Sequence, residues 1–296
     1  MRRLAEAMRR RGASVTVTSL PRCAFDTELA SGIDIPGLYG ELPDAVFVRS
    51  ISAGTLEQIT FRLGVLHALR TSGVRVWNDA RAIERCVDKS MTTFLLHKAG
   101  IPTPRTRTVE GEDPAVAYTA AAGRPLIFKP LFGSQGKGLL RVDGEDDLPE
   151  PVAADNIYYL QDYVPPPPSA GTAPAETVFE DWRVIATRSR IVAAMGRRGG
   201  TWITNVHQGG SPVRCDVTPE MADLTLASLA AVDADYGGVD LIRAPDGRLL
   251  VLEVNSNPSW RGLQSVVDVD VAATIVDDFL AAVAAHRRQQ NPSCPA

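Results

Sequence analysis

The sequence predicts an α/β protein whose N-terminal unit is a doubly wound parallel sheet. Two observations carry this prediction. Between residues 14 and 78, short runs rich in Val, Ile and Phe alternate with a long helical pattern, which is typical of strands joined by crossover helices. Further along the chain, short apolar runs follow one another between Gly, Pro and Asp turns, which indicates paired strands.

The elements of the first unit follow in order along the chain. We expect a helix at 2–11, strands at 14–18 and 44–49, a helix at 56–72 and a strand at 74–77. A sheet built from strand–helix–strand units begins with a strand, whereas this pattern begins with a helix. We therefore expect the first strand to be missing from the start of the given chain. No G-x-G-x-x-G sequence follows a strand here, so the unit lacks the fingerprint of a dinucleotide site.

A second group of elements begins with a helix at 88–99. Gly100, Pro102 and Pro104 follow this helix in the order expected for a helix stop. The elements expected next are a helix at 114–122, strands at 125–130, 139–142, 157–164, 181–186 and 190–196, a helix at 219–236, a hairpin and a final helix. A Pro- and Ala-rich segment at 165–175 is typical of a linker. We therefore place three domains, at residues 1–86, 87–164 and 165–296.

The composition excludes several classes of protein. With a formal net charge of -4 over 296 residues and no long basic run, the chain lacks the electrostatic footprint of a nucleic-acid binder. Cys23, Cys86, Cys215 and Cys294 are too scattered for a zinc site or a disulfide framework, so we expect a reducing cytoplasm. The apolar stretch 266–285 contains four aspartates, so we expect a surface helix and no membrane span.

The hairpin at 237–258 carries the most informative polar side chains. Its two arms are apolar, so Asp240 and Glu253 are costly to bury unless a cation meets them. Glu253 and Asn255 are two residues apart and share a face. If Arg243 pairs with Arg248, Asp240 joins them on that face. Three oxygen donors of this kind suit Mg²⁺. The alternative is a set of solvated carboxylates on an open sheet face.

A glycine-rich segment follows Lys129, which ends an apolar strand. The segment contains Gly133, Ser134, Gln135, Gly136, Lys137 and Gly138. Its glycines allow backbone N–H groups to approach phosphate oxygens, while Lys129 supplies a positive charge. The segment is not a Walker loop, because that motif needs Gly at position 131 and a helix afterwards. The alternative is a simple glycine turn.

Three further cations are candidates for anion contacts. Lys89 opens the helix after Asp88, where anions bind and a lysine gains nothing from the helix dipole. Arg183 and Arg197 lie on strands or strand ends, and their planar groups match carboxylate or phosphate oxygens. Each residue has an ordinary alternative, as a solvated lysine or as half of a surface ion pair.

Taken in order, these features resemble the ATP-grasp superfamily, and within it the RimK-like amino-acid ligases. The motifs that carry the resemblance are residues 78–83 with 88–89, 99–104, 128–130 with 133–136, 205–210 and 252–258. The resemblance implies two α+β ATP-grasp subdomains, after the N-terminal unit, that clasp ATP between them. It also implies an enzyme that binds ATP and Mg²⁺, with Mn²⁺ as a substitute for the metal.

The resemblance assigns roles to individual residues. Lys89 and Lys129 are similar to the two nucleotide-contacting lysines, and 133–138 to the loop that closes over the phosphates. Gln161, Asp162, Tyr163 and Val164 match the adenine-binding hinge, with Asp162 where Glu is usual. Asp240, Glu253 and Asn255 match the metal ligands. Arg183, Arg197 and Asn205 match positions near the transferred phosphoryl group and the acid substrate. Ser256, Asn257 and Arg261 follow the metal ligands and are the candidates for substrate contact.

The activity implied by the resemblance is ATP-dependent joining of a carboxylate to an amine through an acylphosphate. The lack of a Cys/His or Ser/His/Asp constellation fits, because this chemistry needs no covalent enzyme nucleophile. We expect L-glutamate to be added to a small-molecule cofactor carboxylate such as a pterin. The alternatives are addition of amino acids to a protein C-terminus or carrier protein, an impaired ATP-binding module, and a surface-interaction protein with coincidental motifs. The oligomeric state stays open, and a homo-oligomer is compatible with the sequence.

Overall fold

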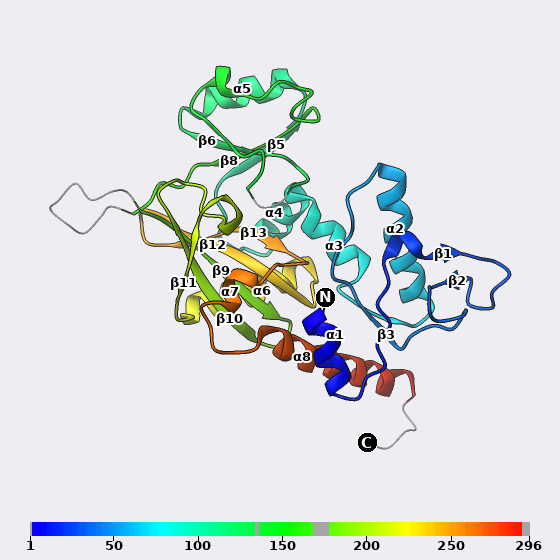
Figure 1. The fold of residues 1–296 in the computed structure, drawn as a ribbon. Helices are drawn as coiled ribbons and strands as arrows, with labels where there is room; N and C mark the ends of the chain where they lie inside the picture. Colours follow the sequence, from blue (N-terminus) through cyan, green and yellow to red (C-terminus); the bar gives the residue numbers. More distant parts are fainter. Residues whose placement is uncertain (1, 134–135, 168–177, 292–296) are drawn as a thin grey trace.

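A computed structural model describes residues 2–133, 136–167 and 178–291 of the chain. Figure 1 shows three groups of elements: a small N-terminal part around helix α2, a four-stranded sheet covered by helix α5, and a five-stranded sheet flanked by helices α6 and α8. The prediction of an α/β protein is confirmed. The parallel part is narrower than expected, since only β3 and β4 pair in parallel among the described strands.

The N-terminal part is built around a short parallel pair of strands. Its elements are α1 (Arg2–Arg10), η1 (Leu20–Arg22), β1 (Ala24–Phe25), β2 (Ile33–Asp34), β3 (Ala45–Phe47), α2 (Leu56–Thr71), β4 (Arg75–Trp77) and α3 (Ala80–Val87). Helix α2 begins with a capping box, in which Thr55 and Gln58 each satisfy the other's backbone N–H. Its buried residues Val65, Leu66 and Leu69 pack against the strands. This packing fixes the carboxyl ends of β3 and β4, which face the rest of the molecule.

The prediction of a strand at 14–18 is wrong. This segment has no regular secondary structure, and no described strand pairs with it. Val17 is 53% exposed, and the carbonyl of Val15 accepts a hydrogen bond from the Arg9 side chain instead of from a neighbouring strand. The alternating pattern therefore belongs to an irregular connection after α1, which itself packs against α8.

The four-stranded sheet is entirely antiparallel, in the order β5-β8-β6-β7. Its strands are β5 (Thr106–Glu110), β6 (Leu126–Lys129), β7 (Leu140–Val142) and β8 (Ile157–Asp162), with α5 (Glu112–Ala122) on one face and η2 (Glu145–Asp147) beside it. Leu126, Phe128, Tyr158 and Leu160 form its core with residues of α5. The sequence analysis did not predict the polar edge strand β5, which has a single Val among its five residues.

The five-stranded sheet has the order β11-β10-β9-β12-β13, also antiparallel throughout. Its strands are β9 (Phe179–Thr187), β10 (Ile191–Gly199), β11 (Ser211–Arg214), β12 (Tyr236–Arg243) and β13 (Leu249–Asn255). The helical elements associated with it are α4 (Lys89–Lys98), η3 (Val206–Gln208), α6 (Pro219–Val232), α7 (Arg261–Gln264) and α8 (Val271–Gln290).

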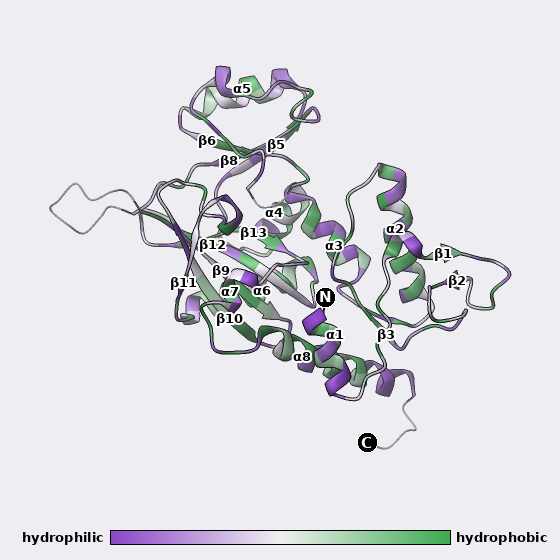
Figure 2. Cartoon of the chain, viewed as in Figure 1, coloured by the Kyte–Doolittle hydropathy of each residue, from purple (hydrophilic) through white to green (hydrophobic). Residues whose placement is uncertain are grey.

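Helices cover both faces of this larger sheet. On one face, α6 packs on Val239, Leu241 and Val251, together with Cys86 of α3 and Leu96 of α4. On the other face, α8 and α1 pack on a second apolar cluster. Figure 2 shows α8 changing from hydrophobic to hydrophilic toward its C-terminal end. No helix within the described ranges is both long enough and apolar enough to cross a membrane.

Candidate active site

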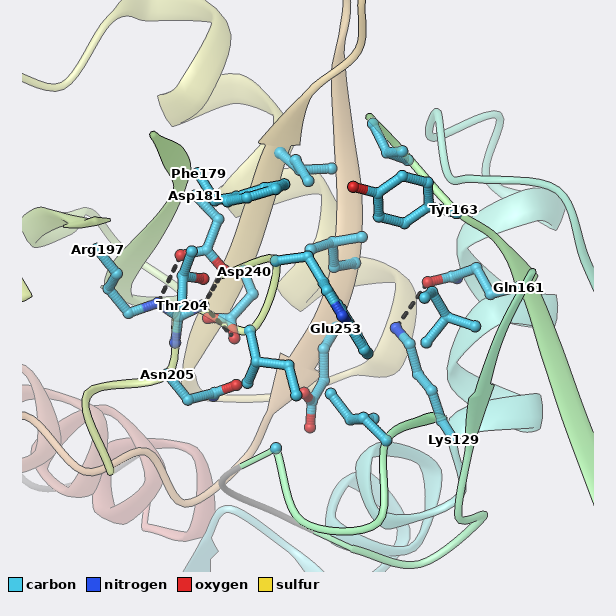
Figure 3. Close-up of a pocket in the computed structure, with 18 of the residues that line it drawn as sticks. Lys129, Gln161, Tyr163, Phe179, Asp181, Arg197, Thr204, Asn205, Asp240 and Glu253 are labelled. Atoms are coloured by element: carbon cyan, nitrogen blue, oxygen red, sulfur yellow. Dashed lines mark hydrogen bonds and ion pairs between the residues drawn. The ribbon is translucent and has the colours of Figure 1, made fainter. Parts of the chain in front are cut away.

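A pocket opens between the two sheets, and both of them contribute side chains to it (Figure 3). The four-stranded sheet and α4 supply Lys89, Lys129, Gly133, Gly136, Lys137, Gln161, Asp162, Tyr163 and Val164. The five-stranded sheet and its loops supply Phe179, Asp181, Arg197, Trp202, Thr204, Asn205, Asp240, Leu252 and Glu253. Of the residues that the sequence analysis singled out, most of those within the described ranges therefore meet here.

The acidic hairpin forms with a different register from the one expected. Arg243 pairs with Leu249 rather than with Arg248, and a β-bulge between Asp240 and Leu241 then brings Asp240 directly opposite Glu253. Relative to the expected pairing, the observed pairing of Arg243 moves the partner of Asp240 by one residue, and the bulge moves it by one more. Because two shifts restore the original face, Asp240, Glu253 and Asn255 still lie on one side of the sheet. The expected grouping holds for a reason that the sequence pattern did not contain.

Four charged side chains on β9, β10 and β12 form a connected network. Arg183 grips both oxygens of Asp240, with N–O distances of 2.7 and 2.6 Å. Arg197 grips both oxygens of Asp181, at 2.7 and 2.5 Å, and also donates to Asp240 at 3.0 Å. Asp181, Arg197 and Asp240 are each at most 5% exposed. Planar guanidinium groups gripping carboxylates at two points fix the orientation of both partners.

The network sets the charges of its members. Burial opposes the ionised form of Asp240, but Arg183 and Arg197 outweigh it and lower the pKa of that carboxyl. Burial likewise opposes the charge of Arg197, yet Asp240 and Asp181 raise its pKa. For Asp181, burial dominates and raises the pKa, although Arg197 acts in the opposite direction. Asp240 is therefore held as an anion at neutral pH, and Arg197 as a cation.

The ammonium of Lys129 is held by a chain of neutral polar groups. Its ammonium donates to Gln161 Oε1 at 2.6 Å, and the Gln161 amide nitrogen donates to Thr106 Oγ1 and to the Tyr159 hydroxyl, each at 3.1 Å. The Tyr159 hydroxyl lies 2.7 Å from Thr93 Oγ1 on α4. Burial lowers the pKa of Lys129 to about 8, a shift that Glu253 opposes. This cation has no ionised partner within 4.0 Å among the described residues.

Lys89 ties α4 to the beginning of the glycine-rich segment. Its ammonium donates to the carbonyls of Pro130, Leu131 and Gly133 at 2.9–3.2 Å. Burial lowers its pKa, while Glu253 raises it. At its far end the segment has positive φ angles at Gly136 and Gly138, and a Cβ at Gly136 would lie 2.6 Å from Asn205 Oδ1. Gly136 therefore lies close to the loop of the five-stranded sheet that carries Asn205. Ser134 and Gln135 lie outside the described residues.

The segment expected to bind adenine, 161–164, runs along the edge of the pocket. The Asp162 side chain points away toward Arg124, which it meets at 2.9 Å. Gln161 Oε1 accepts a hydrogen bond from Lys129, so neither the Gln161 nor the Asp162 side chain is available to hydrogen-bond to a base. Tyr163 and Val164 line the pocket, and the apolar side chains of Ile127, Ile242 and Leu252 are also part of its wall. A flat aromatic ring fits such a slot.

Some expected residues take other places. Arg183 lies behind Asp240 and is not among the described residues that line the pocket. Asn255 accepts a hydrogen bond from the backbone N–H of Asn257 at 2.9 Å. Ser256 is buried, whereas Arg261 is exposed at the start of α7. Residues 255, 256 and 261 are thus not among the described residues that line the pocket.

The sequence analysis missed Asp181 and Thr204. Both are buried residues of the pocket wall. For Asp181 a signal existed, because it precedes Arg183 by two residues on one strand, so that the two side chains share a face. Thr204 directly precedes Asn205 in a loop and carries no such pattern.

The donor set fits a magnesium ion. No group of three or more His, Cys, Asp or Glu side chains suited to a metal lies within the described ranges. Asp240 and Glu253, paired across the hairpin, with the amide of Asn255 nearby, nevertheless provide oxygen donors of the kind Mg²⁺ takes. Asn255 Oδ1 accepts one hydrogen bond and keeps a second lone pair. Because Mg²⁺ retains waters and shares substrate phosphates, few protein donors suffice.

Comparison with known proteins agrees with this geometry. Among solved structures, ATP-grasp ligase PsnB complexed with a minimal precursor, Mg and ADP aligns with a TM-score of 0.70 at 19% identity, over 96% of this chain and 94% of that chain. D-cycloserine synthetase DcsG aligns with a TM-score of 0.67 at 20% identity, over 96% and 94%. The fold is therefore the ATP-grasp fold.

Sequence comparison narrows the class. Residues 86–279 match the RimK-like ATP-grasp domain. The tetrahydromethanopterin:alpha-L-glutamate ligase of Methanococcus maripaludis is 35% identical over 240 residues, which cover 79% of this chain and 78% of that protein. The probable alpha-L-glutamate ligase of Alkalilimnicola ehrlichii is 30% identical over 282 residues, covering 93% and 89%. The chain belongs to the RimK-like ATP-grasp family.

Proposed function

We propose that this ligase uses ATP and Mg²⁺ to join L-glutamate to a carboxylate of a small-molecule cofactor, such as a pterin. One observation carries the ATP-dependent part: a pocket that places Lys89 of α4 and Lys129 of β6 opposite Arg197, Asp240 and Glu253 of the five-stranded sheet. Two lysines suit the phosphates of a nucleotide, while the opposite wall supplies oxygen donors for a divalent cation. The similarity to relatives named for glutamate ligation supports the choice of substrates.

The nucleotide is held by positioning and charge. The base enters the slot formed by Ile127, Val164 and Leu252, and its phosphates extend toward Lys129 and the glycine segment. Asp240, Glu253 and Asn255 would hold magnesium, which would neutralise charge on the phosphates. Arg197 is fixed by Asp181 and Asp240, so the side chains of this wall need no rearrangement to align the phosphates.

The chemistry then proceeds in two steps. The acid substrate's carboxylate oxygen attacks the γ-phosphorus, the bond to the β-phosphate oxygen breaks, and an acylphosphate and ADP form. The glutamate amine then attacks the acyl carbon, loses a proton, and expels phosphate to leave an amide. Gly136, which lies against Asn205, closes this side of the site, and excluding water there prevents hydrolysis of the acylphosphate.

The test is an ADP-release assay with L-glutamate and a panel of cofactor carboxylates, with the products weighed by mass spectrometry. We expect one acid to give a product heavier by a glutamyl unit. Glu253→Ala should abolish ADP release, whereas Glu110→Ala, on the exposed edge strand β5, should leave it unchanged. If Glu253→Ala bound Mg²⁺-ATP and formed ADP like the parent protein, the proposed site would be wrong.

The same assay separates the alternatives. Product formation only with a protein C-terminus or a carrier protein as acceptor would replace the small-molecule acid. Nucleotide binding by calorimetry without ADP release for any acid and amine would indicate an ATP-binding module without turnover.

A further inference from the structure

The loop that follows β13 is held by side chains from the N-terminal part of the chain. Residues 256–260 come directly after Asn255, the third oxygen donor of the proposed metal site. Three successive backbone carbonyls of this loop, those of Ser256, Asn257 and Pro258, each accept a hydrogen bond from Arg49 or Asn78. Both donors stand just past the carboxyl ends of the parallel strands β3 and β4.

Arg49 makes the larger share of these contacts. Its Nη1 donates to the carbonyl of Asn257 at 3.1 Å, and its Nη2 donates to the carbonyl of Pro258 at 2.7 Å. The guanidinium also lies over the Trp260 ring, 4.6 Å from the ring centroid. One planar cation thus fixes two peptide groups with its edge and an aromatic side chain with its face. A lysine cannot reproduce this arrangement, because an ammonium is a point charge without a plane.

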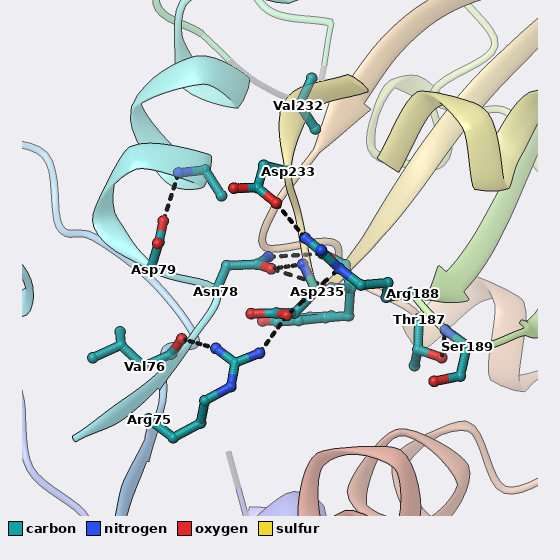
Figure 4. A network of polar contacts seen from close by, with 12 residues as sticks. Arg75, Val76, Asn78, Asp79, Thr187, Arg188, Ser189, Val232, Asp233 and Asp235 are labelled. Carbon is teal, nitrogen blue, oxygen red and sulfur yellow. Dashed lines mark hydrogen bonds and ion pairs between the residues drawn. The ribbon is translucent and has the colours of Figure 1, made fainter. Parts of the chain in front are cut away.

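Asn78 anchors the start of the same loop, as Figure 4 shows in part. Its amide nitrogen donates to the carbonyls of Tyr236 and Ser256 at 2.7 and 2.9 Å, and its amide oxygen accepts from the backbone N–H groups of Asp235 and Tyr236. Asn78 is fully buried, so all four of its hydrogen-bonding positions are satisfied inside the protein. The loop therefore begins at a rigid point.

The contacts continue from the loop to the proposed metal ligand. The peptide N–H of Asn257 donates to Asn255 Oδ1 at 2.9 Å, and the carbonyl of the same residue is the one that Arg49 holds. The position of Asn257 therefore determines which lone pair of Asn255 is occupied and where the other points. Groups of this kind, one step removed from a metal, orient the ligands that touch it.

We propose that Arg49 is a positioning residue, which acts through the Asn257 backbone to orient the side chain of Asn255 toward the magnesium ion of the nucleotide complex. The inference rests on the proposed function of the pocket. It makes the N-terminal part of the chain a component of the nucleotide site, although it supplies no residue to the pocket wall described above.

The test compares ADP affinity with and without Mg²⁺, by titration calorimetry in excess magnesium and in EDTA. In the parent protein, magnesium should tighten ADP binding. In Arg49→Met, we expect that gain to fall about tenfold while the affinity in EDTA stays within about twofold, since the lysines and the base slot are untouched. Arg49→Lys should fall between the two, because an ammonium can still reach one carbonyl.

Arg70→Met is the matched control. Arg70 belongs to the same N-terminal part and forms an ion pair with Asp79 at 2.5 Å, but it makes no contact with the loop. It should keep the full magnesium effect. An unchanged magnesium effect in Arg49→Met, or an equal loss with and without magnesium, would overturn the positioning role. A parent protein whose ADP binding ignores magnesium would instead overturn the proposed metal site.

Discussion

The charged side chains on the two walls of the pocket have different kinds of partner. On the side of the four-stranded sheet, Lys89 and Lys129 are held by neutral groups, three carbonyls and one amide. On the side of the five-stranded sheet, Asp181, Arg183, Arg197 and Asp240 neutralise one another.

This difference indicates which wall can bind an anion. A buried ammonium that faces only dipoles retains its charge for an incoming phosphate, but at a cost to the stability of the free protein. A closed network of ion pairs costs little once it is complete, and it fixes geometry instead. The lysine wall therefore supplies affinity for the nucleotide, and the carboxylate wall supplies alignment. Substitutions on the two walls should change stability in opposite directions.

The largest effect is expected on the carboxylate wall. Asp240→Ala leaves Arg183 and Arg197 facing each other without their shared anion, which should lower the free energy of unfolding by about 3–5 kcal/mol. Chemical denaturation measures this change. Asp143→Ala removes an exposed partner of Arg141 and should cost less than about 1 kcal/mol. Equal losses for both variants would show that the network is not a closed unit.

The lysine wall should respond in the reverse sense. Lys129→Met removes a buried charge that has no ionised partner, and it leaves Gln161 Oε1 without its donor. Because the cost of burying the charge exceeds that of the lost hydrogen bond, the free energy of unfolding at pH 7 should rise by about 1 kcal/mol. The same variant should bind ADP about tenfold to a hundredfold more weakly, because a charge-assisted contact is lost. Denaturation and calorimetry check the two effects. Lys98→Met, at an exposed helix end, should change neither; a destabilised Lys129→Met protein would contradict the comparison.

The pH dependence of nucleotide binding sharpens the same point. With its pKa lowered to about 8 by burial, Lys129 of the free protein loses its proton as the pH rises above that value, whereas bound phosphate favours the protonated form. ADP affinity should therefore fall above pH 8, by up to about tenfold per pH unit, with proton uptake on binding.

Calorimetry at pH 8.5 in buffers of different ionisation heat measures this proton uptake. Lys129→Arg is the control for the pH effect, because arginine stays charged throughout this range. An identical pH profile in that variant would assign the titration to another group.

The smallest effect is expected where the two walls meet. Gly136 has a φ of 71°, and an added Cβ would approach Asn205 Oδ1. Gly136→Ala should therefore cost about 1 kcal/mol of stability in thermal unfolding and weaken ADP binding a few-fold. Gly144→Ala, at a position with no atom within 4 Å of the added Cβ, should be neutral. If both variants behaved alike, the glycine segment would not close against the opposite wall.

Much of the fold follows from local patterns. The long helix α2, the stop after α4 and the apolar hairpin arms all have signals in adjacent residues, and these predictions match the structure closely. Residues 14–18 have a strand pattern but lack a described partner strand, and pairing cannot be predicted from one segment alone. The polar edge strand β5 was missed because its hydrogen bonds to β8, rather than its side chains, define it.

The residues of the site were easier to predict from the sequence than the contacts between them. The candidate residues within the described ranges largely meet in or beside the pocket. The partners of Arg197 depend on which strands become neighbours: β10 beside β9 brings it to Asp181, and β9 beside β12 brings Arg183 to Asp240. That order is set by tertiary packing. The grip of Arg49 on Asn257 spans 208 positions and has no local signal.

Because of the β-bulge in β13, the face on which each side chain lies depends on the length of the strand as well as on its composition. In a regular strand, Leu252 and Glu253 would point to opposite faces, but with the bulge both line the pocket, while Val251 and Val254 face α6. An apolar wall for the base and a carboxylate for the metal thus come from adjacent residues. Deleting one residue at this point would move the side chains at one end of β13 to the opposite face of the sheet. Insertions and deletions here are therefore more damaging than any conservative replacement.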